Sequence, residues 1–155
     1  MSLTPGVGSF RTQLNIAYRF IDGYPSFIGA SAGLSFTAAV PTHQAHDMIV
    51  VFAVNTSGSG IPVAPANEGW ISCYTRSDTG TGYHIAYKYA KSSNEAVGNW
   101  LPADRIIAAV YRNARAPVGV ATNSAQSSAS LISYPAPDAP VIGSGGTRLL
   151  RFGFS

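Results

Sequence analysis

The chain has 155 residues, enough for one domain with its own core, because a chain of this size buries roughly 70% of its unfolded surface on folding. Charged residues make up only 11% of the chain, against roughly 25% in an average globular protein, and the formal net charge is +3. The ten basic residues are dispersed, which argues against nucleic acid as a partner because such binding needs clustered positive charge. A neutral surface instead suits lasting contact with other proteins, since few charges need desolvating.

Residues 1–33 form an N-terminal arm or extension in our interpretation, because their composition differs from the β-rich sequence that follows. Apolar residues between positions 10 and 21 have helical spacing, but Ile16, Tyr18 and Phe20 also alternate as in a strand. Runs this short fit both periodicities, so helix and strand stay open. The arm either reaches onto a neighbouring subunit or packs on its own domain, because a terminus is ordered only when it is tied down.

From residue 34 onward the sequence predicts strands. Residues 34–40 are expected to form a strand that ends at Pro41. Residues 48–54 and 106–111 are continuous apolar runs rich in β-branched and aromatic side chains. Because a strand that is apolar on both faces belongs inside a packed structure, we expect these two runs to be central strands.

Residues 83–89 are the clearest case of alternation, which predicts one core face and one face in water. The core set is Tyr83, Ile85, Tyr87 and Tyr89, and the set in water is His84, Ala86 and Lys88. Residues 70–75 precede this strand, and a Gly- and Ser-containing connection predicts a β-hairpin over residues 70–90. Residues 148–154 are expected to form the last strand.

Turn-rich stretches separate the strands, at residues 55–69, 92–98 and 135–146. Several short strands broken by Gly and Pro, without a convincing long helix, indicate a sandwich or barrel. We therefore predict an all-β fold, a jelly-roll-like two-sheet β-sandwich over residues 34–155, preceded by the arm.

Cys73 is the only cysteine, so no internal disulfide forms, and we expect a buried and inert thiol. Residues 1–11 lack the charged start and the apolar run of a signal peptide. The sequence contains no run approaching the roughly 20 apolar residues that span a membrane. We expect a protein that is made in a cytoplasm and has no membrane partner.

Two short motifs invite a chemical interpretation. Ser31 stands in Gly29-Ala-Ser-Ala-Gly33, which matches the G-x-S-x-G of the hydrolase nucleophile elbow, but that motif needs a strand-to-helix turn and a β-like segment follows here. His43, His46 and Asp47 gather types that bind transition metals, yet no further ligand stands out. We expect a small-residue loop at the first motif and a polar turn at the second.

The remaining candidates are acidic and aromatic side chains. The seven acids are isolated in turn-like contexts, and we interpret them mostly as solvated strand ends, although carboxylates on facing strands can meet as in glycosidases. The aromatic residues fit either a core or a stacking platform for sugars. Because no complete set of acid, base and nucleophile is visible, we predict no enzyme, no catalytic, cofactor-binding or metal-binding residues, and no cofactor.

A family resemblance runs from about residue 25 to the end of the chain. Its motifs are Pro41-Thr-His-Gln-Ala-His-Asp47 before an apolar strand, Glu68-Gly-Trp70 after a Pro-containing loop, Ile85-Ala-Tyr-Lys-Tyr89, the Ser-Ser-Asn-Glu95 turn, Trp100, and residues 106–112. In these motifs and in their order the chain resembles bacteriophage virion structural proteins of the β-sandwich type, found as capsid decorations or in tails.

The resemblance implies a virion component that is made in the host cytoplasm and acts through contacts with other capsid or tail proteins. It implies no catalytic residues. Virions are held by many repeated contacts, so a closed homo-oligomer is expected, as a trimer or a higher ring. Relatives of this type often continue past the position of Phe154. The resemblance therefore implies that a sheet edge of this chain is open to pairing with a neighbour. The alternative is a carbohydrate- or receptor-binding β-sandwich module that recognises a host-surface glycan.

Overall fold

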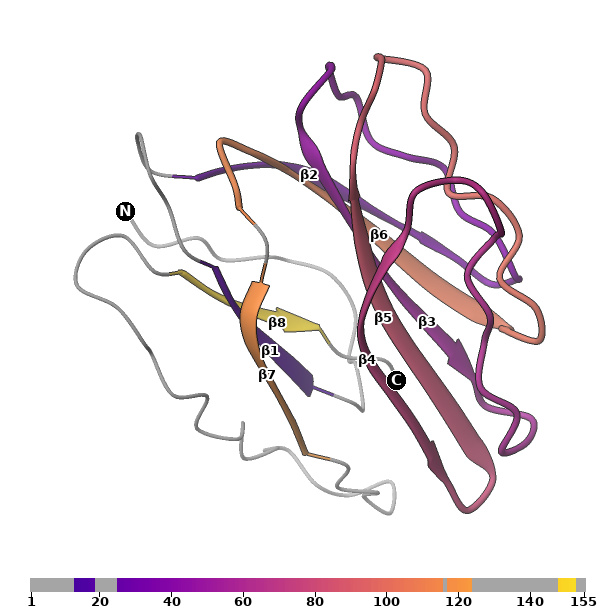
Figure 1. The fold of residues 1–155 in the computed structure, drawn as a ribbon. Helices are drawn as coiled ribbons and strands as arrows, with labels where there is room; N and C mark the ends of the chain where they lie inside the picture. The colour runs from indigo at the N-terminus through magenta and orange to yellow at the C-terminus, as the bar shows by residue number, and fades with distance from the viewer. Residues whose placement is uncertain (1–12, 19–24, 116, 124–147, 153–155) are drawn as a thin grey trace.

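A computed structural model describes residues 13–18, 25–115, 117–123 and 148–152 (Figure 1). These residues contain strands and no helix, which confirms the all-β prediction. The strands are β1 (Gln13–Tyr18), β2 (Ser26–Gly33), β3 (Met48–Asn55), β4 (Ile71–Asp78), β5 (Thr81–Tyr89), β6 (Arg105–Arg112), β7 (Pro117–Asn123) and β8 (Arg148–Phe152). Within this part of the chain no helix is long and apolar enough to cross a membrane.

Five strands form an antiparallel sheet in the order β2-β6-β3-β5-β4 (Figure 1). β3 is central, and every one of its residues is buried. The continuous apolar runs at 48–54 and 106–111 lie in β3 and β6, as the sequence predicted, because strands buried on both faces need apolar side chains on both. The hairpin predicted over residues 70–90 is also present, as β4 and β5.

The other three strands form a second sheet in the order β7-β1-β8. β1 is its centre and pairs antiparallel with both neighbours. The sequence left a helix and a strand open at this position, and the structure has the strand. The last predicted strand is present as β8, whose described residues end at Phe152.

The two faces of the five-stranded sheet carry separate apolar clusters. The first is built around Phe52, Tyr87 and Tyr111, which lie on β3, β5 and β6. The second is built around Val51 and Ala108 on the opposite face, and Trp100 covers it from the connection between β5 and β6. The connections that follow β2, β3 and β5 thus serve as the cover of this second face.

The prediction of a strand at residues 34–40 is wrong. The segment has no ladder partner, and it lies along the second cluster with Ala38 and Val40 packed against it. Two of its carbonyls accept hydrogen bonds from outside the segment: that of Phe36 from Trp100 N, and that of Ala39 from the Ser31 hydroxyl. Alternate apolar residues can pack on a sheet without a ladder partner, as Ala38 and Val40 do here, while Leu34 and Phe36 stay exposed.

The predicted division between an arm and a domain at residues 33 and 34 falls at the end of β2. β2 is hydrogen-bonded to β6 along its length, so the five-stranded sheet begins at Ser26. Most of the expected arm lies outside the described residues. In residues 1–24, the structure describes β1 alone.

Candidate functional site

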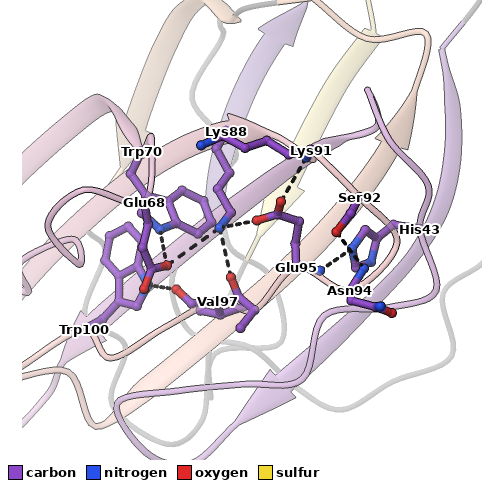
Figure 2. A network of polar contacts seen from close by, with 11 residues as sticks. His43, Glu68, Trp70, Lys88, Lys91, Ser92, Asn94, Glu95, Val97 and Trp100 are labelled. Atoms are coloured by element: carbon purple, nitrogen blue, oxygen red, sulfur yellow. Dashed lines mark hydrogen bonds and ion pairs between the residues drawn. The ribbon is translucent and has the colours of Figure 1, made fainter.

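The second face of the sheet carries a network of polar side chains centred on Lys88 (Figure 2). The Lys88 side chain projects from β5 under the connections and is 3% exposed. Its Nζ lies 3.0 Å from Oε2 of Glu95 and 3.7 Å from Oε2 of Glu68, and it donates to the carbonyl of Ala96 at 3.0 Å. It also stands 4.7 Å from the centre of the Trp70 ring.

This arrangement compensates for removing an ammonium group from water. An unpaired buried charge is very costly, but two carboxylates, a carbonyl and the negative face of an indole satisfy this one. The side-chain hydrogen bond from Lys88 holds the pKa of Glu95 below its ordinary value, and the backbone hydrogen bond from Lys91 acts in the same direction. The carboxylate therefore stays charged in mildly acidic solution.

His43 extends the network to the segment before β3. Nε2 of His43 accepts from the backbone N of Glu95 at 3.1 Å, so the ring proton is on Nδ1, which donates to the carbonyl of Pro41 at 2.8 Å. Glu95 follows a turn after β5, in which Asn94 N donates to the Ser92 hydroxyl (Figure 2). The imidazole thus joins the connection before β3 to the connection after β5.

Three rings stand edge to face beside this network. The ring of Trp100 lies 5.1 Å from that of Trp70 and 5.2 Å from that of His84, at steep interplanar angles. His84 places Nδ1 2.6 Å from the carbonyl of Pro62 and Nε2 3.0 Å from the Ser72 hydroxyl. Burial lowers the pKa of His84, and the hydrogen bond to Pro62 offsets only part of that shift.

Asp47 joins the segment before β3 to β6, and it is almost fully buried. Its two carboxylate oxygens accept from Nε and Nη2 of Arg112, at 3.0 and 2.9 Å, and from Gln44 N at 2.9 Å. Burial alone would raise the pKa of Asp47, but the hydrogen bonds from Arg112 and Gln44 outweigh it and the pKa is lowered. A bidentate pair of this kind fixes geometry as well as charge.

A further acidic residue, Asp104, fixes the connection after β3. Its Oδ2 accepts from the backbone N and the hydroxyl of Thr56, at 3.0 and 2.7 Å, and from the Ser57 hydroxyl at 2.8 Å. Asp47, Glu95 and Asp104 are therefore anchors of connections, and the interpretation of the acids as mostly solvated strand ends is wrong for these three.

The prediction that His84, Ala86 and Lys88 face water is also wrong, because all three are buried. The alternation was read correctly, since these residues do share a face, but the connections cover that face. Sequence reasoning missed Lys88 as the centre of a network for this reason. The available signal was its place in a strand whose other polar-face residues, histidine and alanine, are both compatible with burial.

The residues singled out as chemical candidates take ordinary structural roles. Ser31 donates to the Ala39 carbonyl. His46 is exposed with a positive φ, while His43 and Asp47 are occupied as described above. In the described part of the chain, no group of three or more His, Cys, Asp or Glu side chains could hold a metal ion. Burial raises the pKa of the half-buried Cys73 thiol to about 11, which keeps it protonated.

The aromatic residues divide between core and surface. Trp100, Tyr87 and Tyr111 are buried, and Trp70 packs on Lys88. Tyr134 lies outside the described residues. Tyr89 is 39% exposed and packs edge to face with Tyr87. Among the aromatic residues that the structure describes, more are buried or packed against the clusters than are exposed.

Comparisons with protein-family models, with curated proteins and with solved structures find no match to this chain.

Proposed function

We propose that this protein is a structural component of a bacteriophage virion, a capsid-decoration or tail-surface protein that acts through protein–protein contacts. It is made in the host cytoplasm and associates with other virion proteins and with copies of itself.

The observation that carries this proposal is the role of the residues on which the resemblance rests. Asp47 binds Arg112, and Glu68, Trp70 and Glu95 surround Lys88. These motif residues use their polar atoms on one another, to hold connections against a sheet. Because the motif residues hold the connections in place, they support a structural role in which the protein acts through its surface.

The surface offers apolar contact area on three neighbouring connections. Trp100 N donates to the Phe36 carbonyl at 2.8 Å, and Val63 N donates to the Leu101 carbonyl at 2.9 Å, so these connections lie side by side. We name their exposed side chains, Phe36, Val63 and Leu101, the loop patch. An exposed apolar patch favours contact with another protein.

The finer fold in this proposal is a two-sheet, jelly-roll-like sandwich. The first cluster is almost fully buried, although the other described side chains packed against it, Cys73, Tyr74 and Tyr83, are themselves only partly buried. An apolar face needs a second layer to bury it. In the view of Figure 1 the three-stranded sheet lies to the left of the five-stranded sheet and the long connections lie to its right, and β7 lies close to β4. The three-stranded sheet is therefore proposed as the cover of the first cluster.

The test is binding to virus particles assembled without this protein. Purified protein should co-sediment with such particles to a fixed stoichiometry, and mass spectrometry of natural particles should find it. Val63→Asp, in the loop patch, should weaken co-sedimentation, whereas Thr75→Asp, exposed on β4, should not. Absence from purified particles, together with failure to bind them, would refute the proposal.

The alternative, a carbohydrate- or receptor-binding module, would appear in the same experiment. It requires saturable glycan binding that is lost when an exposed aromatic residue, such as Tyr89, is changed to Ala. Glycan binding by a protein that is absent from particles would favour the alternative.

A further inference from the structure

The five-stranded sheet ends in two edge strands that differ in their protection. β4 carries Arg76 and Asp78, which pair with each other at 2.9 Å, and it has β7 close by. β2 has no charged residue and no proline, and β6 is its only strand partner among the described residues. Charges, prolines and covering segments are the devices by which proteins block edge-to-edge pairing, and β2 lacks the first two.

An open edge strand presents backbone donors and acceptors at regular intervals. The chemical partner that satisfies such a row is the backbone of another extended strand. A bulge lies between Phe27 and Gly29, at the start of β2, and the register with β6 is regular from Gly29 to Gly33. Residues 37–41 fold back over one face of this segment, where Ser31 donates to the Ala39 carbonyl, whereas Ala30 and Ala32 on the other face are exposed. A further ladder would therefore form at the edge of residues 29–33.

Exposed apolar side chains lie at both ends of this segment. Phe27 is 51% exposed beside its start, and Leu34, directly after Gly33, is 83% exposed. In an antiparallel pair of two β2 strands, the start of one strand lies beside the end of the other. A Phe27 side chain would then approach the Leu34 side chain of the second copy, and both would be removed from water.

We propose that β2 pairs antiparallel with β2 of a second copy of this chain, across a two-fold axis near the middle of the strand. Self-pairing brings no like charges together, because β2 is uncharged, and a two-fold contact closes on itself. Pairing of β2 with β4 of another copy would instead continue from copy to copy, and it would bring in the charged edge. This inference rests on the proposed function and replaces the expected trimer or ring with a two-fold pair.

The experiment is sedimentation velocity on the full chain over a wide range of protein concentrations. The wild-type chain should form a dimer. Ala30→Lys, exposed at the middle of β2, should be monomeric, because the two ammonium groups would meet at the axis. Thr75→Lys adds the same charge to an exposed position on β4 and should stay dimeric.

Far-UV circular dichroism checks that each variant is folded, and Ala32→Lys, also exposed on β2, replaces Ala30→Lys if that variant unfolds. A monomeric wild-type chain, a dimer that persists in both folded β2 variants, or a dimer lost in Thr75→Lys would overturn the inference. Particle binding separates the two proposals. A chain that binds particles as a monomer refutes the two-fold pair and leaves the virion function standing.

Discussion

The Lys88 side chain lies under the connections, and its partners come from two of them. Glu68 belongs to the connection before β4, Glu95 to the connection after β5, and the Trp70 ring covers the ammonium group between them (Figure 2). One buried side chain therefore holds two connections. The sequence could supply the residue types here but not their meeting, since these residues are brought together only when the connections fold back over the sheet.

Lys88→Met should destabilise the protein by roughly 3–5 kcal/mol, because it leaves the half-buried Glu95 carboxylate without its cation. Chemical denaturation measures the loss. Lys91→Met, at an exposed position in the same turn, should stay within about 0.5 kcal/mol of the wild type. Equal stability of the two variants would show that the network is not a significant source of stability.

His84 makes stability depend on pH in the mildly acidic range. Its pKa is lowered in the folded protein by burial, so protons bind more tightly to the unfolded chain. The free energy of unfolding should therefore fall as pH drops below about 6.5, the ordinary value for histidine. Thermal unfolding between pH 7.5 and 5.5, a range set about that value, measures this loss.

His84→Gln should flatten the pH profile, since an amide can still donate to the Pro62 carbonyl but does not titrate. His46→Gln is the control, because His46 is exposed, and its profile should follow the wild type. The carboxylates of Asp47 and Asp104 act at lower pH. The pKa values of Asp47 and Asp104 are lowered, so their contributions are lost only as pH falls below about 3.9 and through those folded values.

Among the elements, β3 and β6 could be predicted nearly to the residue, and the segment 34–40 could not. A continuous run of β-branched and aromatic residues has few stable placements other than a strand buried on both faces. Residues 34–40 alternate as a strand does, but whether a ladder partner is available depends on elements far away in the sequence. β5 shows the same limit, because alternation identified its two faces and not what covers them.

Val51→Asp should be strongly destabilising, by several kcal/mol, because it places an unpaired carboxylate within the second cluster at the centre of the sheet. Thr75→Asp, on the exposed side of β4, should change stability by roughly 0.5 kcal/mol or less. Thermal unfolding distinguishes the two. An unchanged melting temperature for Val51→Asp would contradict the central position of β3.

The whole molecule joins strands that are distant in the sequence. β1 pairs with β7 and β8, so strands from both ends of the chain share one sheet. Apart from the β4–β5 hairpin, the antiparallel ladders link segments that are far apart in the sequence, and such contacts form only after a loss of chain entropy. β1, the N-terminal strand that the structure describes, is the middle strand of this sheet.

Deleting residues 1–22 should disrupt the three-stranded sheet, because β7 and β8 lose the strand that lies between them. Deleting residues 1–12, which stops short of β1, should retain that sheet. Far-UV circular dichroism and thermal unfolding compare the two truncations. A cooperative, unchanged transition in the longer deletion would mean that β1 contributes nothing to the fold.

The sequence by itself determined the strand-rich class, the two central strands, the hairpin and the low charge, because these depend on local composition and periodicity. Only the tertiary structure decided that Lys88, His84 and Asp47 are buried, since burial of a polar group depends on which partner the folded chain brings to it. It also decided that β2 and β4 are the edge strands of the five-stranded sheet. Pairing order is a property of the assembled ladders, and no local pattern in β2 records it.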